Sequence, residues 1–164
     1  MRFVSLLSLL CVATLPALTP ANAQTGGQRY WAMDAGPLSG TGKLIAKAGN
    51  LVAQGRYAEA DPILSDLYGR TDSRQVRFLL GMTSLGQGNA EAARRSFLQS
   101  LSVSRMGHPG AMSGLAVAEA RLGNMDSAHA MLTRLKQQQA HCASRCLNSA
   151  ALDRAVLVTE RLLS

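Results

Sequence analysis

The sequence predicts an all-α protein built from repeated helix pairs. Three turns of similar composition centre on Gly55, Gly88 and Gly123, which are 33 and 35 residues apart. Each Gly has a small residue seven positions before it, another small residue five positions after it, and a large apolar residue nine positions after it. These are Ala48, Ala60 and Leu64 around Gly55; Gly81, Ala93 and Phe97 around Gly88; and Ala116, Ala128 and Leu132 around Gly123. Small residues allow two helices to cross closely, and the large residue fills the gap beside them. Because no long stretch alternates apolar and polar residues, a β-sheet is not expected.

Three helix pairs and a last helix are expected in chain order. The pairs cover residues 43–54 with 58–68, 74–85 with 90–103, and 110–122 with 127–138. Pro62 is expected in the first turn of its helix, where a missing N–H costs little. The last helix, 148–163, carries one stripe at helical spacing: Ala151, Leu152, Ala155, Val156, Thr159, Leu162 and Leu163. Such a helix covers the exposed end of a helical stack, and its polar face is not basic enough to favour a membrane-surface helix.

Residues 1–23 have the features of a signal peptide. Arg2 precedes an apolar run, and small residues precede Gln24 at the positions that signal peptidase reads. The alternative is a retained membrane anchor, but Pro16 interrupts the run, which is shorter than the roughly 20 residues that a spanning helix needs. We therefore expect cleavage before Gln24, no transmembrane segment in the mature chain, and a periplasmic or secreted protein.

Residues 24–41 are predicted to form a flexible linker, because Gly, Ser and Pro are frequent there. Within this linker, residues 30–33 form an island of large side chains that includes Trp31, the only Trp in the protein. Trp31 either docks on the first helix pair or belongs to a short partner-binding segment. The stretch 36–44 lacks the first Gly and the final Ser/Thr of a phosphate-binding loop, so nucleotide binding is not expected.

The charge and the histidines give no support for nucleic-acid binding or catalysis. Without Arg2, 16 basic residues face 10 acidic ones, and they are scattered rather than grouped into a basic run. His108, His129 and His141 are also dispersed, and no paired-carboxylate or nucleophile–base motif accompanies them. We expect no enzyme activity, cofactor or metal. Binding of an acidic envelope polymer or lipid through the scattered Arg residues remains an alternative function.

Cys142 and Cys146 are expected to form a disulfide. With Cys11 removed in the signal segment, these two Cys remain, an even number in an exported chain. Their spacing differs from the CxxC of thiol–disulfide oxidoreductases, and with His141 they fall short of a structural zinc set. The disulfide would pin the turn between the third helix pair and the last helix, in preference to a metal-binding or redox role.

The repeat resembles the tetratricopeptide repeat, whose period is about 34 residues. In that register the repeats are 41–73, 74–108 and 109–143, although the family's aromatic residue in the first helix and its terminal Pro are missing. The resemblance implies a right-handed α-solenoid over residues 42–163. It also implies a concave groove lined by the first helix of each repeat, with partner-binding candidates Ile45, Gln75, Phe78, Met82, Leu85, Val117 and Arg121.

This predicted groove is mostly apolar, and that composition bears on the partner. The family's carboxylate clamp requires Lys and Asn at places that here hold Ile45 and Gly49, Phe78 and Met82, and Ser113 and Val117. An apolar groove suits an amphipathic helix or extended peptide from a protein partner, unless these side chains are simply core. Family analogy therefore favours a scaffold or adaptor in a secretion, pilus or polymer-export complex. A self-associating structural module, hence a homo-oligomer, is the alternative.

Overall fold

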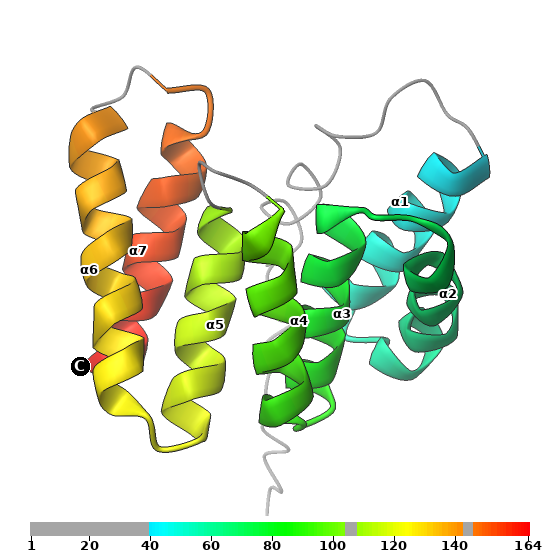
Figure 1. Ribbon diagram of the computed structural model, residues 1–164, viewed down its shortest axis with the longest axis horizontal. Helices are drawn as coiled ribbons and strands as arrows, with labels where there is room; N and C mark the ends of the chain where they lie inside the picture. Colours follow the sequence, from blue (N-terminus) through cyan, green and yellow to red (C-terminus); the bar gives the residue numbers. More distant parts are fainter. Residues whose placement is uncertain (1–39, 104–107, 143–145) are drawn as a thin grey trace, which may run out of the picture.

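A computed structural model describes residues 40–103, 108–142 and 146–164 of the chain (Figure 1). The predicted signal peptide and almost all of the predicted linker, including Trp31, lie outside the described residues. The predictions about export, cleavage and Trp31 docking therefore stay predictions.

The described residues form helices and no strand, so the predicted all-α class is confirmed. Every predicted helix is present, and no boundary differs from its predicted position by more than four residues. The helices are α1 (Gly40–Ala53), α2 (Tyr57–Arg70), α3 (Arg74–Gly86), α4 (Ala90–Ser102), α5 (Pro109–Arg121), α6 (Met125–Cys142) and α7 (Ser149–Leu163). None of these described helices is both long and apolar enough to cross a membrane.

The three predicted turns share one backbone geometry. Gly55, Gly88 and Gly123 have φ angles of +73°, +82° and +82°, a region that side-chain-bearing residues rarely occupy. In each turn the residue after the Gly donates its backbone N–H to the carbonyl five residues earlier, over 2.8 to 2.9 Å. This bond satisfies a carbonyl that the helix end would leave unpaired. The predicted role of the Gly residues is therefore confirmed.

Side chains at the helix starts explain several of the observed boundaries. The Asn89 Oδ1 accepts the backbone N–H of Ala92 over 3.0 Å at the start of α4, and Ser73 plays the same part for α3. Such caps satisfy donors that have no partner inside the helix. Pro62 differs from its prediction: because α2 begins at Tyr57, Pro62 lies beyond the first turn. Its ring nitrogen cannot donate the hydrogen bond that the helix interior would otherwise make there.

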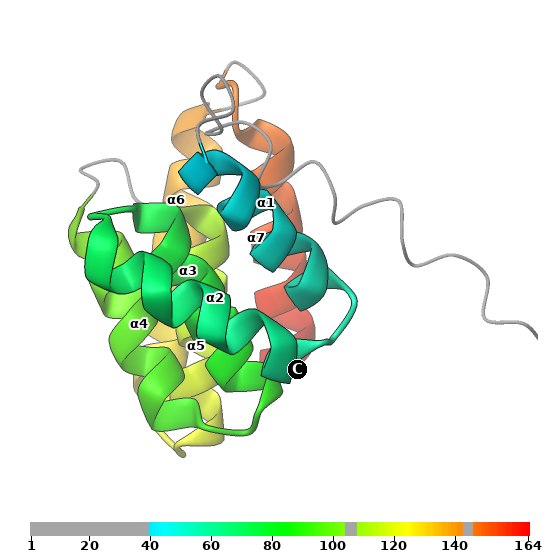
Figure 2. The same cartoon turned by 90° about the vertical axis from the view of Figure 1, so that its right-hand side faces the viewer.

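Consecutive helices pack against one another from α1 to α7. Figure 1 shows the resulting row from the side, and Figure 2 views it from the end at which α1 and α2 lie. The first helices of the pairs also contact each other, α1 with α3 and α3 with α5, and α7 contacts both α5 and α6. Within the described part of the chain, no Cα pair within 8 Å joins α2 to α4 or α4 to α6. The first helices therefore form a common layer, and the second helices are separated along the other side.

The core is organised around the ring of Phe97 on α4, which is completely buried. A Cβ atom added at Gly81 on α3 or at Gly114 on α5 would lie less than 3.0 Å from ring atoms of Phe97. The two glycines thus form a notch for the ring, and the predicted pairing of a small residue with a large one is confirmed in this repeat. In the other repeats Ala48, Leu64, Ala116 and Ala128 are also buried, and Leu132 is partly buried.

The last helix covers the third pair as predicted, with one exception. Leu152, Ala155, Val156 and Thr159 are buried, and α7 packs on α5 and α6. The Thr159 hydroxyl donates to the Ala155 carbonyl over 2.8 Å and lies 3.1 Å from the Ser113 hydroxyl, so this buried polar pair is satisfied. Leu162, expected in the same buried stripe, is 39% exposed.

Candidate interaction surfaces

The predicted groove residues lie on the first helices of the three pairs, of which α3 contacts both α1 and α5. Ile45 is on α1, Gln75, Phe78, Met82 and Leu85 are on α3, and Val117 and Arg121 are on α5. Their exposure differs strongly. Phe78 and Leu85 are buried, Arg121 is exposed, and the other four are partly exposed.

Phe78 lies beneath this surface rather than projecting from it. Only 7% of Phe78 is exposed, and its ring centroid is 4.7 Å from that of His108 and 6.1 Å from that of Phe97. Phe78 and Leu85 are both members of the main hydrophobic core, against which Ile45, Met82 and Val117 pack from outside. A ligand on this face would meet the partly exposed side chains first, and Phe78 would support them from below.

Arg121 joins two of the first helices. Its Nη1 donates to the Leu85 carbonyl oxygen over 2.7 Å, which links the end of α5 to the end of α3. The last carbonyls of a helix have no partner within the helix and carry partial negative charge, so a guanidinium is a favourable partner. Arg121 therefore stabilises the layer of first helices, and its exposed side chain still brings positive charge to the predicted groove.

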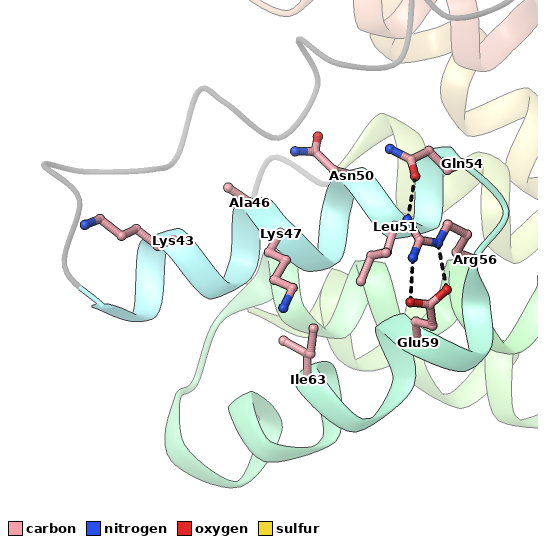
Figure 3. Close-up of a pocket in the computed structure, with 9 residues that line it drawn as sticks. All are labelled: Lys43, Ala46, Lys47, Asn50, Leu51, Gln54, Arg56, Glu59 and Ile63. Carbon is pink, nitrogen blue, oxygen red and sulfur yellow. Dashed lines mark hydrogen bonds and ion pairs between the residues drawn. The ribbon is translucent and has the colours of Figure 1, made fainter.

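A second surface, a hollow of about 650 Å³ between α1 and α2, was not predicted from the sequence (Figure 3). The signal for it was present, because Lys43, Lys47 and Asn50 follow one another at helical spacing on α1, and Gln54 comes directly after the helix. The hollow is lined by Lys43, Ala46, Lys47, Asn50, Leu51, Gln54, Arg56, Glu59 and Ile63.

One end of this hollow holds an ion pair. Arg56 Nε and Nη2 donate to the two Glu59 carboxylate oxygens over 2.7 and 2.6 Å, and Arg56 Nη1 lies 3.3 Å from Gln54 Oε1. The hydrogen bond from Arg56 lowers the pKa of Glu59, and the same bond raises the pKa of Arg56. Both groups therefore remain charged over the physiological range, and they neutralise each other.

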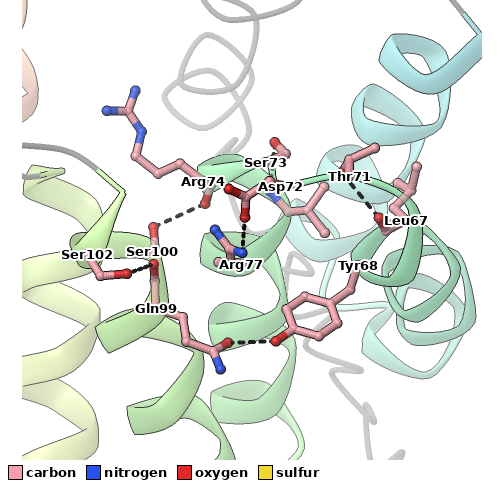
Figure 4. A network of polar contacts seen from close by, with 11 residues as sticks. Leu67, Tyr68, Thr71, Asp72, Ser73, Arg74, Arg77, Gln99, Ser100 and Ser102 are labelled. Atoms are coloured by element: carbon pink, nitrogen blue, oxygen red, sulfur yellow. Dashed lines mark hydrogen bonds and ion pairs between the residues drawn. The ribbon is translucent and has the colours of Figure 1, made fainter.

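A network of polar contacts ties α2, α3 and α4 together near their ends (Figure 4). The Tyr68 hydroxyl donates to Gln99 over 3.2 Å, and the Ser100 hydroxyl donates to the Arg74 carbonyl over 3.1 Å. Arg77 pairs with Asp72 and lies with its guanidinium carbon 5.9 Å from the centroid of the Tyr68 ring. These contacts hold neighbouring helices together.

The cysteines and histidines form no metal-binding cluster in the part of the chain that the structure describes. Cys142 ends α6 and lies at disulfide distance from Cys146, with 5.2 Å between the Cα atoms, as the sequence predicts. His108 Nδ1 accepts the backbone N–H of Ala111 over 3.0 Å and caps α5. His129 and His141 are exposed on α6. No group of three or more His, Cys, Asp or Glu suited to a metal ion is found among the described residues.

Comparisons of this chain with models of protein families, with curated proteins and with solved structures find no match. A function is therefore proposed from two surfaces, the predicted groove on α1, α3 and α5 and the hollow between α1 and α2.

Proposed function

We propose that this chain is a non-catalytic interaction module, a right-handed solenoid of three tetratricopeptide-like helix pairs closed by α7. The observation that carries the proposal is the common layer of α1, α3 and α5, in which partly exposed apolar side chains rest on a buried core. The equal geometry of the three Gly turns supports a true structural repeat. In repeat proteins of this type, stacked first helices provide an extended binding surface.

The ligand of this groove would be an amphipathic helix or an extended segment of a protein partner. Ile45, Met82 and Val117 offer apolar contacts, and the unbranched Met82 side chain adapts its shape to what it meets. Arg121 adds a cation at one end of α5. Together with the predicted signal peptide and the cysteine pair, this surface fits an adaptor or assembly factor of a secretion, pilus or polymer-export complex outside the cytoplasm.

Photo-crosslinking in the native envelope tests this assignment. A photoreactive amino acid at position 82 is better suited than one at position 78, because Met82 is partly exposed and Phe78 is buried. We expect one dominant heterologous protein from position 82, and loss of that product when Val117→Glu places a charge in the groove. Position 98 on α4 is the matched control, because Leu98 is 45% exposed but lies on a second helix. Equal capture from both positions, or crosslinks only within the chain, would contradict the groove assignment.

Self-association is a second candidate function, favoured by the exposed side of α7. Leu157 and Val158 are each 47% exposed, and Leu162 lies one turn after Val158. A second copy of the chain would remove these side chains from water. Sedimentation equilibrium of the wild type should then show a mass that rises with concentration, and Val158→Lys should return it to that of a monomer. A concentration-independent monomer mass in the wild type rules this candidate out.

A further inference from the structure

The hollow between α1 and α2 combines positive charge with an apolar floor. Lys43 and Lys47 are exposed, stand one helical turn apart and make no ion pair with any described residue. Ala46, Leu51 and Ile63 supply its apolar lining (Figure 3). Because Arg56 and Glu59 neutralise each other at one end, the net charge of the lining comes from the two lysines.

We propose that this hollow binds an extended acidic peptide segment of a partner protein. Alternate residues of an extended chain lie about 6.6 Å apart on the same side. Residues four apart on a helix have their Cβ atoms about 5–6 Å apart. Carboxylates at alternate positions of the segment therefore match the spacing of Lys43 and Lys47 on α1. The apolar side chain between them points to the other side of the segment, toward Ile63 on α2. Asn50 continues the stripe with an amide that bonds the peptide backbone.

The composition of the hollow favours a peptide over other anionic ligands. A uniformly charged polymer has no apolar group to place on Ala46, Leu51 and Ile63, whereas a peptide can present one. A lipid surface is contacted by protruding apolar side chains, whereas Leu51 is buried and Ile63 is partly buried within the hollow. The hollow also shares no residue with the predicted groove, so this inference is independent of the groove assignment.

Fluorescence anisotropy with the full chain tests the inference directly. The probe is a fluorescein-labelled peptide in which glutamate alternates with leucine and alanine, and the control peptide carries glutamine in place of glutamate. We expect saturable binding of the acidic peptide only. Lys43→Gln with Lys47→Gln should weaken it about tenfold, as expected for two exposed ion pairs. Added salt should weaken it as well.

Two further variants separate a local site from an effect of total charge. Arg95→Gln with Arg134→Gln removes the same charge from exposed positions on α4 and α6 and should leave the peptide affinity unchanged. Glu59→Gln should strengthen binding severalfold, because it releases Arg56 and adds one net positive charge to the hollow. A gain of affinity in this variant cannot result from misfolding.

Three outcomes would overturn the inference. Equal losses in the lysine and arginine double variants would show that only the net charge matters. Equal binding of the acidic and glutamine peptides would show that the lysines play no part. Saturable binding to phosphatidylglycerol vesicles, lost in the lysine double variant while the acidic peptide fails to bind, would assign the hollow to lipid headgroups. Failure of the groove assignment would appear separately, as an unchanged crosslink in Val117→Glu.

Discussion

Replacing Gly114 with Ala tests the packing of the core most directly. A Cβ atom at this position would lie less than 3.0 Å from three ring atoms of Phe97, and that ring is completely buried. Gly81 approaches the same edge of the ring from α3, so the ring has little room to move away. Overpacking of this kind costs about 1–3 kcal/mol, and the better helix propensity of Ala returns up to about 1 kcal/mol. We expect a net loss of up to about 2 kcal/mol in the free energy of unfolding.

Gly69→Ala is the matched control for this substitution. Gly69 is also helical, but nothing lies within 4 Å of a Cβ atom built there. Only the propensity gain remains, so this variant should be more stable by about 0.5–1 kcal/mol. The two variants should thus differ by the overpacking cost alone, about 1–3 kcal/mol, although the chemical change is the same. Urea unfolding followed by circular dichroism at 222 nm measures both values.

A double-mutant cycle shows whether the loss comes from the Phe97 ring. Phe97→Leu shortens the side chain, so it should cost less in the Gly114→Ala background than in the wild type, with a coupling of more than about 0.5 kcal/mol. Zero coupling, or a stabilising Gly114→Ala equal to Gly69→Ala, would refute the close approach of α4 to α5 at this residue.

Three other measurements test the local contacts. His108→Ala should lower the free energy of unfolding in urea by about 1 kcal/mol, because α5 loses its cap. His108→Asn retains a capping oxygen and should lose less. Equal losses in the two variants would assign the effect to packing of the His108 ring on Phe78. The double variant Cys142→Ser with Cys146→Ser should have a free energy of unfolding about 2 kcal/mol lower than that of the oxidised wild type. Two alkylatable thiols in the wild type, detected by mass spectrometry, would show that no disulfide forms. Because the Arg56 hydrogen bond lowers the pKa of Glu59, the contribution of this pair to stability is present above the unfolded pKa and is lost as the pH falls through the folded pKa. A carboxyl NMR titration should show the Glu59 midpoint rise toward its ordinary value in Arg56→Gln, and an unchanged midpoint would contradict the pairing.

The helices and their turns were predictable because their signals are local. The positive φ of Gly55, Gly88 and Gly123 depends on residues within one turn of the chain. The small–large pairing of Gly81 with Phe97 was also predictable, because the repeat places both residues at fixed distances from the same Gly. The second contact of the Phe97 ring, with Gly114, was not predicted, because it joins the second repeat to the third.

The surroundings of the predicted groove residues could not be predicted from the repeat register. The repeat register assigns Phe78 to the inner face, but register does not determine what lies above a side chain. In the structure the His108 ring, from the residue before α5, lies against Phe78, and its position depends on how the chain enters that helix. Arg121 was assigned to the same face, yet its bond to the Leu85 carbonyl depends on the spacing of α3 and α5. A repeat period of about 34 residues does not predict such contacts between residues far apart in the sequence.

The different positions of the helices within the stack explain why the hollow and the groove differ in chemistry. α5 contacts α3, α4, α6 and α7, and nine of its thirteen residues are buried, mostly Ala, Gly and other small side chains. α1 contacts only α2 and α3 among the described helices, so it can carry Lys43 and Lys47 on its outer side without burying a charge. The same helix presents Ile45 to the layer of first helices. One helix therefore contributes an apolar contact to the predicted groove and a cationic stripe to the hollow.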